Sequence, residues 1–117
     1  MNRIVLEERT KKFHVDIIKL CKHFPKDPSG YEITKQIIRS AGSVGANYRA
    51  TKRAKSKPDF IYKIEIVLEE VDETLYWLEI IRESKLLENE ELCRLIKEAN
   101  ELTSIFAAAD KTAKKNS

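Results

Sequence analysis

Apolar residues recur every three or four positions along most of the chain, the spacing that places side chains on one face of an α-helix. A first segment with this spacing is clear from Phe13 onward. It stops at the sequence FPKDPSG, residues 24–30, where two prolines and a glycine make a helix costly to continue. Three more segments follow, with short connections between them. The pattern predicts four helices, at about residues 8–24, 30–55, 57–84 and 89–112.

Residues that can cap a helix mark the starts of the last three segments. Ser29 stands three residues before Glu32, and Ser56 stands three residues before Asp59. At this spacing the two side chains bind backbone N–H groups that are free in a first helical turn. Asn89 suits the same role for the fourth segment. We therefore expect helices to begin at these three capping residues.

The connections between the helical segments are short, which forces consecutive helices to run antiparallel. A chain of 117 residues also has the usual size of one domain. The sequence therefore predicts an all-α protein with a single domain over residues 1–117. Its expected architecture is an antiparallel up-down-up-down four-helix bundle.

No apolar run approaches the roughly 20 residues that a membrane-spanning helix needs. The first residues, MNRIVLEERTKK, contain no apolar stretch of signal-peptide length. The two cysteines, Cys21 and Cys93, lie in helical patterns and have no CxxC or metal-binding spacing. These features predict a cytoplasmic protein with reduced thiols and no membrane partner.

Sequence patterns that carry catalysis are absent. The two histidines, His14 and His23, both fall in the first helical segment, and neither belongs to the Glu-x-x-His pattern of di-metal bundles. The sequence has no Gly-rich phosphate loop and no nucleophile elbow. The carboxylates of residues 69–73 are typical of a solvated or interfacial charge run. We expect a protein that is not an enzyme and that has no metal site and no cofactor.

Charge is divided unevenly along the chain: residues 1–57 hold 14 Lys/Arg and five Asp/Glu, whereas residues 58–117 hold eight and 14. On a helical wheel of the second segment, Gly42 and Ala46 share one line with four cations, Lys35, Arg39, Arg49 and Arg53. Lys52 and Lys55 widen this region. We call the six cations the basic stripe: Lys35, Arg39, Arg49, Lys52, Arg53 and Lys55.

The basic stripe has two interpretations. Guanidinium groups bind phosphate through two parallel hydrogen bonds, so the stripe would bind the backbone of RNA or DNA, with Arg49 and Arg53 as the leading contacts. Alternatively, its cations pair with carboxylates of the helix predicted at 57–84, within or between chains, and the protein is an interaction or assembly scaffold. The small residues Gly42 and Ala46 predict a close approach by another helix or by a phosphate backbone.

The helix predicted at 57–84 has apolar residues on two faces. Opposite its core stripe, the wheel places Tyr62, Ile66, Tyr76 and Ile80. The outer face of a helix in a monomeric bundle is polar as a rule, so these four residues predict self-association.

Three polar residues lie beside the apolar stripe of the second helix: Ser40, Ser43 and Asn47. Asparagine is a poor helix former, so its position within a helix indicates a specific partner. We expect the three residues to form a hydrogen-bond cluster that sets helix register, with Asn47 bound to a carboxylate of the third helix.

Residues 40–81 carry a resemblance to a known family; their sequence is SAGSVGANYRATKRAKSKPDFIYKIEIVLEEVDETLYWLEII. This run closely resembles the small four-helix-bundle proteins named for members encoded in intervening sequences of bacterial 23S ribosomal RNA genes. The family pattern is matched over residues 69–79 and at Ser43, Val44, Asn47, Asp59 and Phe60. The likeness extends over nearly the whole chain.

The resemblance implies a four-helix bundle that assembles as a homopentamer, with a suspected role in binding nucleic acid and no enzymatic activity. A relative is the accessory factor of retroelement reverse transcriptases and uses a basic surface. A reverse transcriptase or another protein is therefore an implied partner. This chain has Tyr48, Arg49 and Ala50 where one branch of the family has Ala-Glu-Gly.

Overall fold

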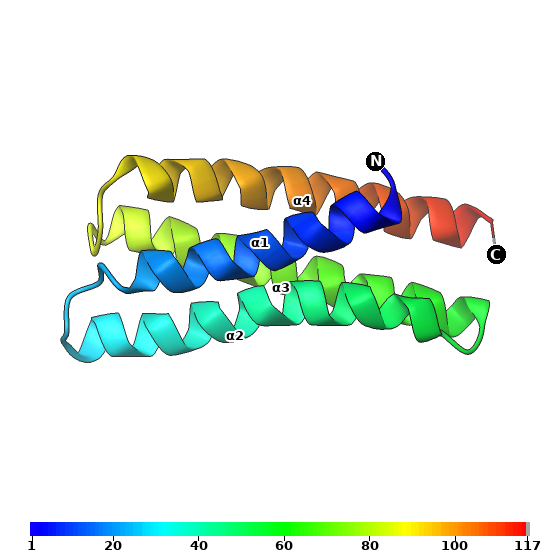
Figure 1. Ribbon diagram of the computed structural model, residues 1–117, viewed down its shortest axis with the longest axis horizontal. Coiled ribbons are helices and arrows are strands. Elements are labelled where there is room, and N and C mark those ends of the chain that lie inside the picture. The colour runs from blue at the N-terminus through cyan, green and yellow to red at the C-terminus, as the bar shows by residue number, and fades with distance from the viewer. Residues whose placement is uncertain (117) are drawn as a thin grey trace.

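The computed structural model describes residues 1–116, which form one helical bundle (Figure 1). Its elements are α1 (Arg3–Cys21), α2 (Pro28–Ala50), the 3₁₀ helix η1 (Thr51–Arg53), α3 (Lys57–Glu83) and α4 (Glu90–Lys115). The long helices lie side by side along an axis of 46 Å, each antiparallel to the next in the chain. The predicted all-α class and bundle arrangement are confirmed. Within residues 1–116, no helix is both long and apolar enough to cross a membrane.

The first helix begins at Arg3, several residues before the predicted start at about residue 8. Asn2 caps it, because its side-chain oxygen accepts a hydrogen bond from the Val5 N–H at 2.9 Å. The early turns of α1 are held to the bundle by Leu6 and by Thr10, which is fully buried. The Thr10 hydroxyl donates to the Leu6 carbonyl at 3.1 Å. A polar residue at a core position explains why apolar spacing did not extend the predicted helix.

The second helix differs from its prediction at both ends. Its cap is Asp27 and not Ser29: Oδ1 of Asp27 accepts from the Gly30 N–H at 2.8 Å. The aspartate precedes a proline, which has no N–H to satisfy and favours a first helical turn, so the helix starts earlier. At the other end, α2 stops at Ala50 and does not continue to residue 55. One turn of 3₁₀ helix and the extended residue Ala54 lead the chain to α3 instead.

The predicted starts of the last two helices are confirmed. Oγ of Ser56 accepts from the Asp59 N–H at 3.1 Å, and Oδ1 of Asn89 accepts from the Leu92 N–H at 2.8 Å. The Asp59 carboxylate reaches back to the N–H of Lys55 at 2.9 Å, just before the cap. These bonds lie within one helical turn, which is why local spacing was enough to predict them.

The core is filled by apolar side chains from all four long helices, among them Phe13, Ile37, Leu78 and Phe106, each almost completely buried. Burial of each such side chain contributes roughly 1.5–3 kcal/mol to folding. The ring of Tyr48 packs edge-on against Phe106, with the ring centroids 5.3 Å apart. This packing holds the C-terminal end of α2 against α4.

Buried hydroxyl groups join α2 to α3. The Thr74 hydroxyl donates to Oγ of Ser40 at 2.8 Å, and neither side chain is exposed. The observed hydrogen-bond partner of Asn47 differs from the predicted carboxylate of the third helix. Its side-chain amide donates to the Ser43 carbonyl, one turn back in the same helix, at 2.8 Å. A short polar side chain can bond to its own backbone in this way, so Asn47 needs no carboxylate from α3.

Charged side chains span the seam between α1 and α4, which pack less closely than α1 and α2 do. Arg9 binds Glu98 at 2.7 Å, and Arg94 binds Asp16 at 2.7 Å. Burial alone would raise the pKa of the Asp16 carboxyl, but hydrogen bonds from Lys12 and Arg94 lower it by more. These ion pairs hold the N-terminal helix beside α4.

Candidate functional site

The basic stripe is divided by its neighbours, because α2 lies between α1 and α3. Arg39 faces α3: its guanidinium donates to Glu70 at 3.1 Å and to Glu73 at 2.5 Å. The bond to Glu73 is the main cause that raises the pKa of Arg39. Arg39 therefore pairs with carboxylates of the third helix in its own chain, as the second interpretation of the stripe predicts.

Lys52 also has an internal partner. Its ammonium group lies 3.3 Å from Oε1 of Glu7 in α1. Burial would raise the pKa of the Glu7 carboxyl, but Lys52 and Arg3 together lower it. Lys52 thus ties η1 to α1 while remaining partly exposed.

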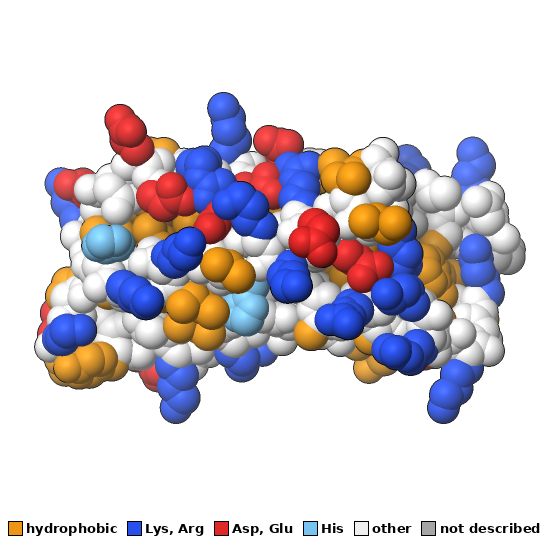
Figure 2. Space-filling model, viewed as in Figure 1, with side chains coloured by type: hydrophobic (Ala, Val, Ile, Leu, Met, Phe, Trp, Pro, Cys, Tyr) orange, Lys and Arg blue, Asp and Glu red, His pale blue; other side chains and the backbone are white. Residues whose placement is uncertain are grey.

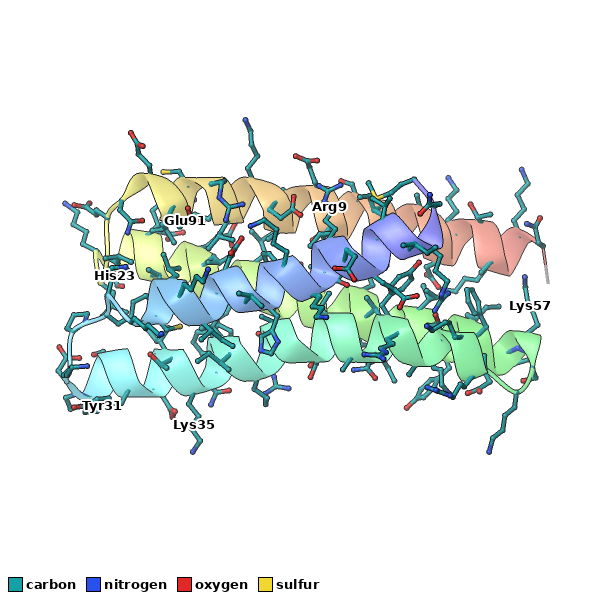
Figure 3. All side chains as sticks on the ribbon, in the orientation of Figure 1. Arg9, His23, Tyr31, Lys35, Lys57 and Glu91 are labelled. Carbon is teal, nitrogen blue, oxygen red and sulfur yellow. The ribbon has the colours of Figure 1, made fainter. Side chains whose placement is uncertain are left out.

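The other four predicted cations are exposed and make no ion pair with any residue from 1 to 116: Lys35, Arg49, Arg53 and Lys55. They are not all together. Figure 3 places Lys35 near one end of the bundle and Lys57 at the other, beside the α2–α3 turn. Lys57, which is also exposed and unpaired within the described chain, lies two residues beyond Lys55.

We call the group at the α2–α3 connection the basic turn: Arg49, Lys52, Arg53, Lys55 and Lys57. Because the α-helix ends at Ala50, the last four of these cations are distributed around the turn and do not continue along one line. In Figure 2, Lys and Arg side chains are spread over the whole visible face, and a group of them lies in its right-hand part with Asp and Glu side chains beside it. The carboxylate in this part of the chain, Asp59, binds Lys63 at 2.8 Å, and that bond is the main cause that lowers the pKa of Asp59.

The small residues in the middle of the stripe face α1. A Cβ added at Gly42 would lie 3.0 Å from the His14 imidazole, so the close approach predicted there is made by another helix of the same chain. Beside it, a groove of about 410 Å³ runs between α1 and α2. Arg49 lines this groove, but so do the carboxylates of Glu7 and Glu8. The mixed charge of the groove makes it a poorer site for a polyanion than the basic turn.

The predicted outer face of α3 is only partly exposed. Tyr62 and Tyr76 are 62% and 53% exposed, whereas Ile66 and Ile80 are half-buried. Ile80 packs against the core. Trp77 was not among the residues predicted for this face, but it lies beside them: its indole N–H donates to Glu73 at 3.3 Å and its ring lies edge-on to Tyr76. Its flanking position on the helical wheel was the available signal.

The described residues place no group of three His, Cys, Asp or Glu side chains where a metal ion could bind. Burial raises the pKa of the Cys21 thiol to about 11, so this group stays protonated at neutral pH. Cys93 is exposed, and both cysteines are free thiols.

Comparison with protein-family models tests the family resemblance that the sequence pattern indicated. The family model described as "23S rRNA-intervening sequence protein" matches residues 3–108. The chain belongs to this family. No curated protein matches the chain.

A solved structure supports the same assignment. It is a protein of unknown function from the S23 ribosomal protein family of Bacteroides thetaiotaomicron VPI-5482, determined at 1.70 Å resolution. The two chains are 32% identical, with a TM-score of 0.84, over 95% of this chain and 99% of the other. The four-helix arrangement is therefore shared across most of both molecules.

Proposed function

We propose that this protein is a non-catalytic bundle that binds the backbone of RNA or DNA through the basic turn. The observation that carries the proposal is the set of three exposed cations there that make no carboxylate ion pair in residues 1–116, namely Arg49, Arg53 and Lys57. Lys55 is also exposed, but it interacts electrostatically with Asp59. The family name refers to where its members are encoded and does not state a ligand, so the proposal rests on the charge of the basic turn. A nucleic-acid ligand fits the cytoplasmic location expected from the sequence.

Unpaired cations favour phosphate binding for a physical reason. A cation that already binds a carboxylate must give up that partner before it can bind phosphate, whereas an unpaired cation loses only water and counterions. Arg49 and Arg53 can each grip a phosphate with two hydrogen bonds. Arg39 and Lys52, which have carboxylate partners, contribute less in this proposal. The ligand is recognised by charge, so binding is expected to have little sequence preference.

A second role, self-assembly, is favoured by a separate observation. Tyr62 and Tyr76 are more than half exposed on the outer side of α3. Aromatic side chains are enriched in protein interfaces, so this face suits contact with another copy, consistent with the homopentamer that the family resemblance implies. Assembly would bring several basic turns together and strengthen binding through multivalency. The proposal also includes binding of the assembly to a protein partner, such as a reverse transcriptase.

The proposal is tested by charge reversal at the basic turn. The variant R49E/R53E is compared with K22E/K26E, which changes net charge equally but alters exposed cations outside the basic stripe. Binding of a labelled 20-nucleotide RNA or DNA is measured by fluorescence anisotropy at several salt concentrations. We expect R49E/R53E to lower affinity about 100-fold at low salt and to reduce the salt slope by about two, the effect of two lost phosphate contacts. The control is expected to lose less than about fivefold.

Light scattering on the same variants separates the two roles. An unchanged mass with lost binding supports nucleic-acid binding through the basic turn. A smaller assembly in R49E/R53E would instead show that these arginines form subunit contacts, as the scaffold interpretation requires. A wild-type protein that binds neither RNA nor DNA, or equal losses in the two double variants, would overturn the proposed interface.

A further inference from the structure

An apolar hollow of about 440 Å³ lies at the same end of the bundle as the basic turn. Figure 1 shows that α1 begins short of the end reached by α3 and α4. The hollow lies beside this start and is lined by side chains from all four long helices, including Leu6, Tyr48, Phe60, Ile64, Ile105 and Phe106. Three of these side chains are aromatic, but Tyr48 and Phe106 are buried, so half-buried Phe60 is the one of the three with an accessible ring surface. Figure 2 shows hydrophobic side chains at the right-hand end, between Lys and Arg side chains.

Cations border the hollow on two sides. The Arg3 guanidinium lies 4.8 Å from the centroid of the Tyr48 ring and donates to the Tyr48 carbonyl at 3.0 Å. On the other side, the ammonium group of Lys57 lies 6.0 Å from the centroid of Phe60. Lys57 belongs both to the basic turn and to the lining of the hollow. The charged surface and the apolar hollow are therefore continuous.

This combination fits a ligand that carries anionic groups and flat apolar groups a short distance apart. Single-stranded nucleic acid has this chemistry, because its phosphates are followed by bases whose faces are free to stack on aromatic side chains. In a duplex, neighbouring base pairs cover those faces. Arg3 is already paired with Glu7 at 3.1 Å, so an apolar peptide would fill the hollow but would leave Lys57 and the rest of the basic turn without a ligand anion.

We infer that the protein prefers single-stranded nucleic acid and that one unstacked base enters the end hollow against Phe60, while adjacent phosphates contact the basic turn. The inference rests on the proposed function and adds the type of strand and the position of a base. Phe60 is half-buried and packs against the core, so its ring is held in place and a stacked base does not have to order it first.

The test compares single strands with duplexes of the same length. In F60L the side chain remains apolar and of similar size, so the core contact is retained while the aromatic face is lost. We expect the affinity of F60L for a 20-nucleotide single strand to fall about 5- to 20-fold, the scale of one lost base stack, with an unchanged salt slope. Affinity for a 20-base-pair duplex is expected to stay the same. The matched control is Y31L, which alters an exposed tyrosine at the opposite end of the molecule (Figure 3).

A second measurement uses the wild-type protein and so does not depend on how the variant folds. The fluorescent base 2-aminopurine is placed within the single strand, where stacking on its neighbours quenches it, and its emission is followed on binding. We expect the emission to rise with wild-type protein and with Y31L, because the base leaves its neighbours, and to change much less with F60L. Unchanged emission in the wild type would overturn the inference.

The remaining outcomes distinguish this inference from the proposed function. If R49E/R53E loses binding but wild type and F60L bind single strands and duplexes equally, only the base site is wrong. If F60L changes the mass of the assembly in light scattering, the hollow is a contact between copies, and the base site is again wrong. If wild-type protein binds no nucleic acid, both proposals fail.

Discussion

The two halves of α2 contain the same kinds of residues but use them differently. In the N-terminal half and at the centre, polar groups are satisfied inside the chain: Asp27 caps the helix through the Gly30 N–H, Arg39 binds two carboxylates of α3, and Ser40 accepts from Thr74. In the C-terminal half, Arg49 is exposed and unpaired within the described residues, and so is Arg53 in the turn that follows. Both halves pack in the core, but the C-terminal half also presents an arginine without an ion pair to the surroundings.

The difference shows that the position of a cation in a stripe does not determine its role. Antiparallel packing brings the middle of α3 beside Arg39, and that part of α3 carries Glu70 and Glu73. The end of α2 instead meets the start of α3, where the Asp59 carboxylate is already bound by Lys63 and by the backbone of Lys55. Glu7 in turn binds Lys52. Arg49 and Arg53 are therefore left without an ion pair in the described residues, although Glu7 and Glu8 line the groove beside Arg49.

The largest expected effect on stability comes from replacing a glycine of α2 with alanine, which adds one methyl group. The effect should differ between the two halves of the helix. In G30A, the new Cβ would lie 1.9 Å from the Pro25 carbonyl oxygen, so the backbone must move. We expect the free energy of unfolding in urea to fall by about 3 kcal/mol or more. In the control G45A, the nearest atoms of Thr10 are 3.6 Å away, an ordinary contact, and alanine favours a helix by up to about 1 kcal/mol. Equal effects of the two substitutions would contradict this contrast.

A smaller effect is expected at the buried hydroxyl groups. In T74V, Oγ of Ser40 loses its donor while remaining fully buried, which is expected to lower the free energy of unfolding by about 1–2 kcal/mol. In T74V the Ser40 hydroxyl keeps its bond to the Ile37 carbonyl at 3.3 Å. In an S40A background the same substitution should cost less, because the bond between the two hydroxyl groups is already absent. The control is S43A, in the C-terminal half of α2. Because the Ser43 side chain is only half-buried, this substitution should change the free energy of unfolding by less than about 0.5 kcal/mol. A cost for T74V that is independent of Ser40 would show that the hydroxyl pair is not coupled.

The smallest expected effect on stability is the difference between charge reversal at Arg39 and charge reversal at Arg49. R39E places a third carboxylate beside Glu70 and Glu73, and we expect it to destabilise the bundle by about 1 kcal/mol at low salt. About half of that cost should disappear at 1 M salt, where charges are screened within about 3 Å. R49E should leave the free energy of unfolding within about 0.5 kcal/mol of wild type, since Arg49 has no internal partner in the described chain. A destabilising effect of R49E as large as that of R39E would remove the distinction between the two halves.

Features set by neighbours in sequence were predicted well. The caps at Ser56 and Asn89 follow from side chains that bind N–H groups three residues later, and such bonds form whenever the helix does. The start of α1 was misplaced because Thr10 occupies a core position, where its hydroxyl bonds to the preceding turn. The end of α2 was misplaced because no single residue marks the change from α-helix to the 3₁₀ turn at Thr51.

The candidate site was only partly accessible to sequence reasoning. A helical wheel places Arg39 and Arg49 close to one line, but it contains no information about which carboxylates lie opposite each of them. It also could not show that His14 of α1 fills the space beside Gly42. Residues of the end hollow, such as Tyr48 and Phe60, appear in sequence as ordinary core positions.

By itself, the sequence determined the helical class, the number of long helices, the direction of each relative to the next and a surplus of positive charge before residue 58. These properties depend on short-range periodicity, short connections and composition. Only the tertiary structure decided which cations are paired and where aromatic rings border them. Pairing depends on the lateral register between helices, and residues far apart in the chain, such as Arg39 and Glu73, become neighbours only when the core has packed.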